Sequence, residues 1–312
     1  MIYDLRETAR QLRENAPAAI AHWEQHYTSQ LENAMQLVMD NRNRSPVVLL
    51  AGPSGSSKTT SGRRLRDLLI RHHISAHLVS MDNYYLSWDT PSFPMTADGQ
   101  RDLEAPECLD IPLLNAHFAM LEAGEAIDVP IYSFPTSSRL EDRSIHMDIA
   151  PGDVFIFEGI HALNDMFTGQ HPCACRLYVS PVSAFGADRQ ILCQPQQLRL
   201  MRRIVRDHQF RGATAEYSLE LWPNVLASEK IYIEPHRTEA HGTIDTTLGY
   251  EVQALRPYIL PLLQNLPSTI PSYDKVEHAI EMLRRITPLD SSFVPDDSIL
   301  REFIGSRRIF PS

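Results

Sequence analysis

Cysteine is scarce in this sequence, and long hydrophobic runs are absent. Only 4 of the 312 residues are cysteines. They form no C-x-x-C pair, and Cys173-Ala174-Cys175 offers too few ligands for a zinc site, so we interpret the cysteines as reduced and structural. No run approaches the roughly 18 apolar residues of a membrane span, and residues 1–6 lack the apolar segment of a signal peptide. These absences predict a cytoplasmic protein without a membrane partner.

Positive charge is also in the minority. The chain has 29 Lys and Arg residues against 39 Asp and Glu residues, a formal net charge of -10 at pH 7. Such a chain is not expected to bind nucleic acid through its overall field, so a polyanionic ligand requires a local cluster of basic residues. The apolar content of 43% and charged content of 22% are typical of a globular protein.

Residues 46–51, Pro-Val-Val-Leu-Leu-Ala, form an apolar run that is typical of a buried parallel strand. The small residues after this run are typical of a phosphate-binding loop, and a helix is predicted to begin near Lys58. In such a loop, backbone N–H groups surround phosphate oxygens, Lys58 reaches the β- and γ-phosphates, and the Thr59 hydroxyl binds Mg²⁺. The sequence therefore predicts ATP and Mg²⁺ as cofactors. The predicted nucleotide-binding residues are Gly52, Ser54, Gly55, Ser56, Ser57, Lys58, Thr59 and Thr60.

Ser57 departs from the loop pattern, which has glycine at this position. Because glycine permits a close approach of the backbone, we expect the Cβ and hydroxyl of Ser57 to weaken nucleotide binding. The alternative interpretation of the whole segment is a surface turn rich in glycine and serine, followed by an ordinary helix.

Two further predicted strands end in a carboxylate. The strand at 77–81 is followed by Asp82, and the strand at 154–157 is followed by Glu158, at the position of a Walker B acid. The carboxyl ends of parallel strands lie on the ligand-binding edge of a doubly wound sheet, so both acids are candidates for the site. The alternative for Glu158 is a helix N-cap or a solvated loop acid.

A predicted helix at 197–210 is rich in arginine. Arg202 and Arg206, together with Arg199, share one face by their i, i+3 and i+4 spacing. Arginines at this density repel each other unless an anion lies among them. The helix therefore predicts an anion-binding face, and a solvated basic face is the alternative.

The two ends of the chain carry no recognisable chemistry. Residues 1–44 are predicted to form amphipathic helices, the second beginning near Ala16-Pro17, in which Trp23 and Tyr27 pack internally. The alternative is a contact between two copies in a homo-oligomer. We expect the main domain to span 45–290 and a tail to span 291–312.

Six motifs follow one another along the chain, at 52–60, 80–85, 103–107, 130–134, 157–160 and 202–207. In this order they resemble the uridine kinase and phosphoribulokinase family of P-loop kinases over about residues 45–305. The bacterial uridine-kinase-like branch is the most similar, although its members often carry a threonyl-tRNA-synthetase-like domain in place of the helical extension. The resemblance implies an α/β P-loop NTPase fold: a doubly wound, mainly parallel sheet with helices on both faces and an arginine-rich lid helix.

The resemblance also implies roles for individual residues. The acid matching Asp82 lies beside the acceptor hydroxyl and accepts its proton, while the residues matching Glu158 and Thr59 help to hold Mg²⁺. Asp82 is also a candidate ligand of this metal. The acid matching Glu104 binds the ribose 2′- and 3′-hydroxyls. Other residues line the nucleoside pocket or form the lid over the phosphates. They are Tyr85, Tyr132, Phe134 and Ser137 for the pocket, and Arg202, Arg206 and Arg211 for the lid.

Phosphoryl transfer depends on positioning and charge neutralisation. Lys58, Mg²⁺ and the lid arginines, Arg206 among them, are expected to stabilise charge on the γ-phosphoryl oxygens. Asp82 is expected to orient and deprotonate a primary hydroxyl. Neighbouring arginines or Mg²⁺ are expected to keep its carboxylate ionised near neutral pH without a raised pKa.

Two departures from the family pattern concern the acceptor. Glu104 is one methylene longer than the Asp of well-known uridine kinases, and Ser137 stands about where those enzymes have a base-reading His. We therefore expect a nucleoside or a related ribose-bearing small molecule, with ribose recognition better preserved than base recognition. A sugar phosphate acceptor, or a nucleotide-binding regulator without turnover, stays open, as does the choice between ATP and GTP.

Overall fold

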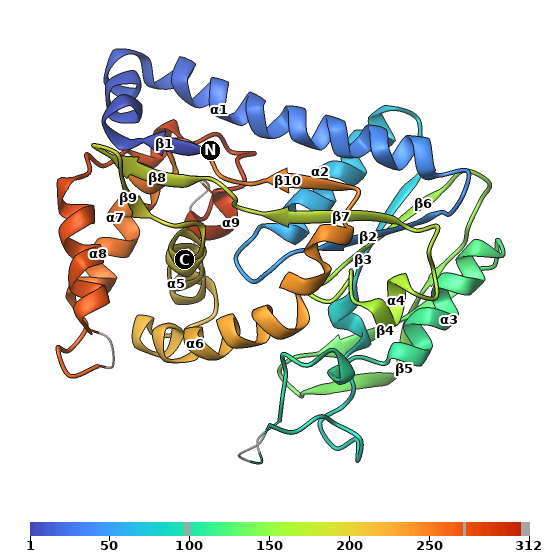
Figure 1. The fold of residues 1–312 in the computed structure, drawn as a ribbon. Helices are drawn as coiled ribbons and strands as arrows, with labels where there is room; N and C mark the ends of the chain where they lie inside the picture. The colour runs from blue at the N-terminus through green and yellow to red at the C-terminus, as the bar shows by residue number, and fades with distance from the viewer. Residues whose placement is uncertain (97–98, 100, 271–272, 307–312) are drawn as a thin grey trace.

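A five-stranded parallel sheet forms the centre of the molecule (Figure 1). The computed structural model describes residues 1–96, 99, 101–270 and 273–306. The strand order is β10-β7-β2-β6-β3, and every neighbouring pair is parallel. The α/β class and the parallel sheet predicted from the sequence are confirmed. The strands are β2 (Val47–Ala51), β3 (Ala76–Ser80), β6 (Val154–Glu158), β7 (Cys175–Ser180) and β10 (Gly242–Asp245).

Helices cover both faces of this sheet, because successive residues of a strand point to opposite sides. On β2, Val48 and Leu50 join a hydrophobic cluster with residues of α1 and α2. Val47 and Leu49 join a second cluster with residues of α3. The sheet is therefore doubly wound, as predicted. These helices are α1 (Leu5–Asn41), α2 (Lys58–Arg71) and α3 (Ile111–Glu122).

The N-terminal helix α1 lies along the first face of the sheet. Its backbone is non-helical at Asn15, and the side chain of Asn15 accepts a hydrogen bond from the backbone N–H of Ala18 at 3.2 Å. The kink lies where the second helix was predicted to begin. Trp23 is 5% exposed and Tyr27 is fully buried, so both are packing residues, as predicted.

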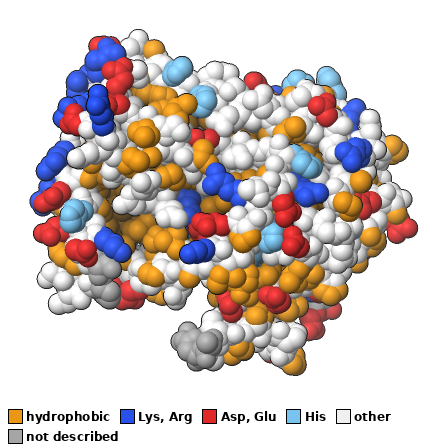
Figure 2. Space-filling view, viewed as in Figure 1, with side chains coloured by type: hydrophobic (Ala, Val, Ile, Leu, Met, Phe, Trp, Pro, Cys, Tyr) orange, Lys and Arg blue, Asp and Glu red, His pale blue; other side chains and the backbone are white. Residues whose placement is uncertain are grey.

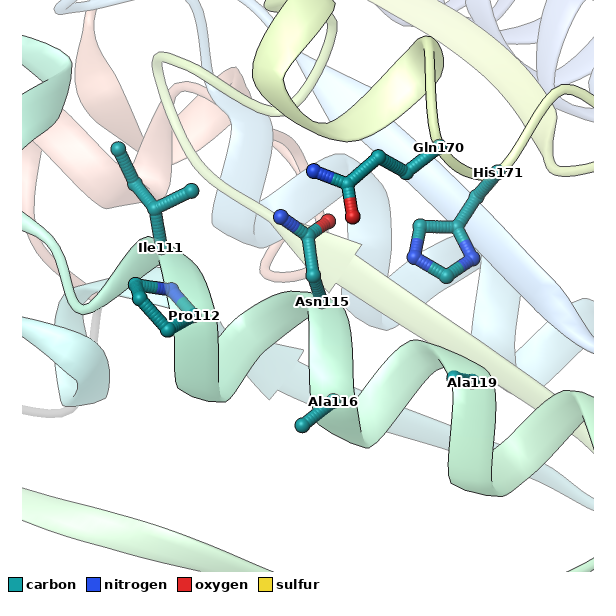
Figure 3. A pocket seen from close by; sticks show the side chains of 7 residues that line it. All are labelled: Ile111, Pro112, Asn115, Ala116, Ala119, Gln170 and His171. Carbon is teal, nitrogen blue, oxygen red and sulfur yellow. The ribbon is translucent and has the colours of Figure 1, made fainter.

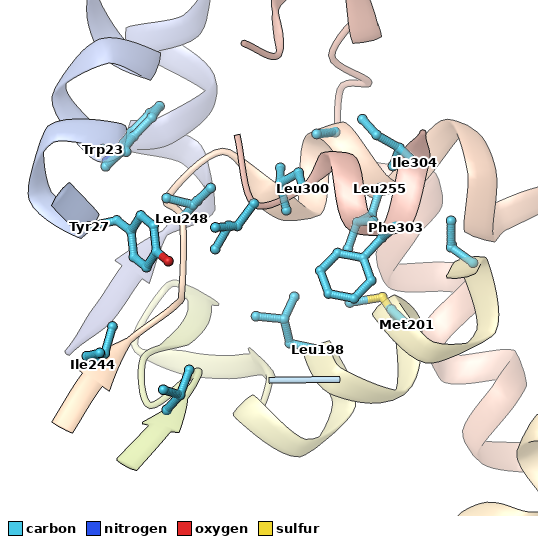
Figure 4. Close-up of a cluster of buried hydrophobic side chains, with 14 of the residues drawn as sticks. Trp23, Tyr27, Leu198, Met201, Ile244, Leu248, Leu255, Leu300, Phe303 and Ile304 are labelled. Carbon is cyan, nitrogen blue, oxygen red and sulfur yellow. The ribbon is translucent and has the colours of Figure 1, made fainter. Parts of the chain in front are cut away.

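The C-terminal segment packs into the same core. Figure 4 shows Leu300 and Phe303 near Leu198 of α5 and Leu255 of α7. Residues from both ends of the chain thus complete the cluster on this face of the sheet. Residues 307–312 of the predicted tail lie outside the described residues. The helices involved are α5 (Pro195–Phe210), α7 (Glu251–Gln264) and α9 (Arg301–Ile304).

Two smaller sheets flank the central one. β4 (Ile127–Ser133) and β5 (Ser138–Met147) form an antiparallel hairpin. β1 (Ile2–Asp4), β8 (Ala184–Ala187) and β9 (Gln190–Cys193) form a three-stranded sheet. The sequence indicated a strand around Pro130 but missed β5, because most residues of β5 are polar and exposed. It also missed β1, β8 and β9, which are too short to show a periodic pattern.

The remaining helices complete the layers around the sheet. Short 3₁₀ helices η1 (Met81–Tyr84), η2 (Pro106–Cys108), η3 (Glu234–Glu239) and η4 (Ser291–Phe293) lie in the connections. Among the residues described, no helix combines the length and the apolar character needed to cross a membrane. The other helices are α4 (Asp165–Thr168), α6 (Ala215–Tyr232) and α8 (Tyr273–Arg285).

Candidate active site

The loop between β2 and α2 has the backbone shape of a phosphate-binding loop. Gly55 has a φ of 74° and Ser57 a φ of 66°, both left-handed. A Cβ on Gly52 would lie 2.0 Å from the carbonyl oxygen of Val179, so a side chain does not fit there. The left-handed conformation costs a residue with a Cβ roughly 1–2 kcal/mol. Conformation thus explains why the pattern has glycine at position 57, and this chain keeps the conformation despite the serine.

The side chains around the loop fit a nucleoside triphosphate with Mg²⁺. Thr59 Oγ1 donates a hydrogen bond to Glu158 Oε1 at 3.0 Å, and hydroxyl and carboxylate oxygens are ligands that Mg²⁺ prefers. The Oγ atoms of Ser56 and Ser57 are buried and have no partner among the described residues. Because an unpaired buried polar group is costly, these hydroxyls favour a bound ligand. Thr59 and Glu158 are therefore the residues that could hold the metal.

The strand register places the two predicted acids beside this loop. Glu158 ends β6 and pairs in register with Leu50 of β2 and Ser80 of β3. Asp82 follows Ser80 by two residues, in η1. Desolvation by the surrounding protein, and next the charge of Glu158, raises the pKa of Asp82 to about 6. The carboxylate is still mostly ionised at pH 7, but its pKa is not the ordinary value that we expected from the sequence.

Lys58 is close enough to several charged residues of the site for their charges to act on its ammonium group. Burial lowers the pKa of its ammonium group, and the positive charge of Arg206 acts in the same direction. The nearby carboxylates of Glu158 and Asp82 act in the opposite direction. The structure thus brings together the loop lysine, both predicted acids and one predicted lid arginine.

Two arginines of α5 support the loop from inside the protein. Arg202 is fully buried, pairs with Glu251, and donates a hydrogen bond from Nη1 to the carbonyl oxygen of Gly55 at 3.1 Å. Arg199 pairs with Glu229 and also donates to the loop backbone. The sequence placed Arg202 in a lid over the phosphates. The structure corrects this prediction. The guanidinium of Arg202 is buried, and its N–H groups donate hydrogen bonds to Glu251, Gly55 and Thr246 instead of facing the phosphates.

The outer arginines near the end of α5 surround Asp207. Its carboxylate lies 3.4 Å from Arg203, 2.8 Å from Arg206 and 3.5 Å from Arg211. The anion that we expected among these arginines is therefore supplied partly by the chain itself. Arg211 also lies close enough to Asp82 to oppose the rise of its pKa. Asp207 was not predicted as a site residue, although it directly follows Arg206 in the sequence.

Three predicted acceptor residues form one aromatic cluster. Ring centroids lie 5.5 Å apart for Tyr85 and Tyr132, 6.0 Å for Tyr85 and Phe134, and 5.1 Å for Tyr132 and Phe134. Phe134 is 61% exposed. Figure 2 shows hydrophobic side chains gathered over β4, β5 and the segment between η1 and η2. An accessible aromatic cluster offers a platform for a planar ring.

The other two predicted acceptor residues occupy different settings. Burial raises the pKa of Glu104, while the positive charge of Arg203 opposes this rise. Ser137 lies in the turn between β4 and β5 with a φ of 50°. Its hydroxyl lies 3.4 Å from the carbonyl oxygen of Phe134. Glu104 is thus beside the basic helix, whereas the Ser137 hydroxyl contacts its own turn.

Arg139 is a supporting residue that the sequence analysis missed. Its guanidinium donates hydrogen bonds to the carbonyl oxygens of Tyr84 and Tyr85 at 2.7 and 2.9 Å, and to Asp110 at 2.8 Å. These bonds attach β5 to the segment that carries Asp82. A single arginine in a polar strand gives no sequence signal for this role.

A pocket of about 610 Å³ lies elsewhere, between α3 and the turn after α4 (Figure 3). None of its lining residues belongs to the phosphate loop, and neither Asp82 nor Glu158 lines it. The pocket is therefore distinct from the predicted site. Its lining consists of Ile111, Pro112, Asn115, Ala116, Ala119, Gln170 and His171.

The site combines a phosphate-binding loop after a buried parallel strand, two acids at the same sheet edge and a basic helix beside them. This combination defines an ATP-dependent P-loop kinase. The sequence profile of the Phosphoribulokinase / Uridine kinase family matches residues 47–251. That segment is more than half of the chain, so the protein belongs to this family.

Curated relatives share this central segment. The uridine kinase of Deinococcus deserti is 30% identical over 203 residues, which are 65% of this chain and 88% of that protein. The uridine kinase of Halobacterium salinarum is 31% identical over 196 residues, which are 62% of this chain and 76% of that protein. A solved D-glycerate 3-kinase from Cryptococcus neoformans, 15% identical, covers 88% of this chain and 87% of its own with a TM-score of 0.34, too low to bear on function.

Proposed function

We propose that this protein transfers the γ-phosphoryl group of ATP to the primary hydroxyl of a nucleoside or a similar ribose-bearing metabolite. The aromatic cluster is the observation that carries the proposal. Tyr85 stands three residues after Asp82 and lies against Tyr132 and Phe134. An acceptor with a planar base can stack on this cluster while its hydroxyl reaches the acid. The uridine kinase relatives support the same acceptor class.

In this proposal, Asp82 orients the acceptor hydroxyl and accepts its proton. A pKa of about 6 leaves this carboxylate ionised at neutral pH and close to the operating pH of a general base. Lys58, Arg206 and Arg211 hold the phosphates by charge. Thr59 and Glu158, with Asp82 as a further candidate ligand, would hold Mg²⁺, which neutralises phosphate charge when bound.

A sugar phosphate is the second candidate acceptor. It needs basic contacts beyond those that hold ATP, and Arg203 lies close enough to Glu104 to affect its pKa. The aromatic cluster, of which Phe134 is exposed, has no evident partner in such an acceptor. We therefore rank a nucleoside first.

The test measures ADP formation from ATP and Mg²⁺ with a panel of acceptors. The panel contains uridine, cytidine, adenosine, guanosine, inosine, their 2′-deoxy forms, ribulose 5-phosphate and D-glycerate, with GTP as an alternative donor. We expect ribonucleosides to react with little preference for the base. Activity with ribulose 5-phosphate or D-glycerate alone would replace the nucleoside proposal. Binding of ATP without ADP formation in the presence of any acceptor would favour a nucleotide-binding regulator.

The ribose contact is tested separately with Glu104→Gln. A buried carboxylate that accepts hydrogen bonds from a cis-diol is left unpaired by a 2′-deoxynucleoside, so we expect the wild type to prefer ribose by about 10²-fold or more. Glu104→Gln should reduce this preference in kcat/KM. Glu107→Gln, which changes an exposed acid of the same segment, is the matched control. An unaltered preference in Glu104→Gln would remove Glu104 from the ribose site.

A further inference from the structure

His161 is a buried polar residue close to the acceptor site that has no assigned role so far. It follows Glu158 by three residues, after β6, and is 2% exposed. Neither of its ring nitrogens has a hydrogen-bond partner among the described residues. Because burying an unpaired polar group destabilises a fold, an imidazole in this state calls for an explanation.

The surroundings of the ring connect it to Glu104. The imidazole ring lies close enough to the main chain of Glu104 that this contact favours the protonated form of His161. Tyr232 packs edge-on against the ring, with ring centroids 6.1 Å apart. Burial, assisted by the charge of Lys58, nevertheless lowers the pKa of His161 to about 4. The imidazole is therefore neutral at pH 7, with one N–H donor and one acceptor nitrogen. A neutral ring in this place can contribute only through packing or hydrogen bonds.

We propose that His161 is a positioning residue for Glu104. In the acceptor complex, the ring N–H donates a hydrogen bond to the main-chain carbonyl of Glu104 and thereby holds the Glu104 carboxylate against the ribose diol. This inference rests on the proposed function. In the free protein the ring lies beside the main chain of Glu104 but makes no complete hydrogen bond to it, so the proposed contact forms when the acceptor binds.

Two hydrogen bonds to Asp102 hold the turn that carries Glu104 in one local conformation. Asp102 Oδ1 accepts hydrogen bonds from the backbone N–H groups of Glu104 at 3.0 Å and Ala105 at 3.1 Å. These bonds hold the main chain at Glu104 and Ala105 against the side chain of Asp102. A contact at the Glu104 carbonyl therefore also determines where the Glu104 carboxylate lies.

A second buried histidine provides a matched control. His171 is 5% exposed, and its Nε2 has no partner among the described residues, like the ring nitrogens of His161. His171 Nδ1 lies 2.9 Å from Glu122, and its ring lines the separate pocket in Figure 3. Substitution of His171 thus reproduces the loss of a buried imidazole away from Glu104.

The experiment compares His161→Phe, His161→Gln and His171→Gln with the wild type. The measured quantities are kcat/KM for uridine and 2′-deoxyuridine, KM for ATP and the melting temperature. His161→Phe removes the N–H, and we expect it to reduce the ribose-to-deoxyribose preference by about 10-fold through KM for uridine, without changing KM for ATP. His161→Gln keeps an N–H and should recover part of the preference. His171→Gln should leave the preference unchanged.

The double variant with Glu104→Gln separates positioning from packing. If His161 acts through Glu104, His161→Phe should have little further effect on the preference in the Glu104→Gln background. His161→Met serves as the variant without an N–H if His161→Phe does not fold. Equal losses on uridine and 2′-deoxyuridine, or a change in melting temperature alone, would overturn the role of His161. A wild type inactive on every nucleoside would instead overturn the proposed function, and this inference with it.

Discussion

The hydroxyl of Thr60 donates a hydrogen bond to the carboxylate of Glu302 at 2.6 Å, across 242 positions of the chain. This bond attaches the C-terminal segment to the first turn of α2. The charge of Glu302 also acts on Lys58 and favours its protonated form. The guanidinium of Arg202, which supports the loop, lies 5.2 Å from the ring centroid of Phe303. The segment for which the sequence showed no role therefore supports the phosphate loop.

A double-mutant cycle of Thr60→Val and Glu302→Ala tests this attachment. A hydrogen bond to a charged group contributes about 1.5–3 kcal/mol, so we expect a coupling of that size in the free energy of unfolding. Denaturant unfolding of the four proteins measures it. Glu281→Ala, at an exposed position of α8, should show no coupling with Thr60→Val. A coupling near zero for Glu302 would show that the bond does not hold the segment.

Arg202 and Arg206 should respond differently to substitution, although both lie on α5. Arg202→Ala leaves the buried carboxylate of Glu251 unpaired, so we expect a loss of about 3–5 kcal/mol in the free energy of unfolding. Arg206→Ala should change stability little but lower kcat by about 10²-fold or more, because it removes a cation from the phosphate site. Denaturant unfolding and steady-state kinetics distinguish the two. Similar stability losses in both variants would contradict the division between support and catalysis.

Asp82→Asn tests the assignment of the base. The amide cannot accept the proton of the acceptor hydroxyl, so we expect kcat to fall by about 10²-fold or more while the affinity for ATP changes little. Steady-state kinetics and nucleotide titration measure the two effects. A loss confined to ATP affinity would identify Asp82 as a metal ligand and place the base elsewhere.

The same variant has a predicted pH signature in the free protein. Because the pKa of Asp82 is raised from 3.8 to about 6, its ionisation destabilises the folded state as the pH rises through this interval. Asp82→Asn should therefore match the wild type in melting temperature near pH 4 and exceed it near pH 7.5. Although protein atoms surround the carboxylate closely enough to raise its pKa, Asp82 keeps access to solvent, and solvent screening keeps the difference small. Scans without nucleotide or metal measure it, and a difference confined to low pH would contradict the raised pKa.

Ser57→Gly should stabilise the loop. The substitution relieves the left-handed strain but makes the unfolded chain more flexible, so we expect a net gain of up to about 1 kcal/mol in the free energy of unfolding. Ser56→Gly is the control, because Ser56 is also buried with an unpaired hydroxyl but is not among the residues with positive φ. The control should lose about 0.5–1 kcal/mol. Equal effects of the two substitutions would show that backbone strain at position 57 is not important.

The sequence by itself determined the parts of this protein that depend on local chemistry. The apolar run of β2 and the small residues after it predicted a strand, loop and helix, because burial and backbone freedom act over a few residues. Asp82 and Glu158 were predicted to meet because parallel strands place their carboxyl ends at one edge. The aromatic cluster came from family motifs, and the structure brings its three rings together.

Only the tertiary structure decided which residues pack against each face of a helix or strand. Helical spacing showed that Arg202 and Arg206 share a side of α5, but it could not show that Glu251, 49 positions away, pairs with Arg202 and buries it. Nor could it show that Thr60 meets Glu302 or that His161 lies against Glu104. The physical reason is that periodicity fixes the direction of a side chain relative to its own helix or strand. Its partners depend on packing between elements that are distant in sequence.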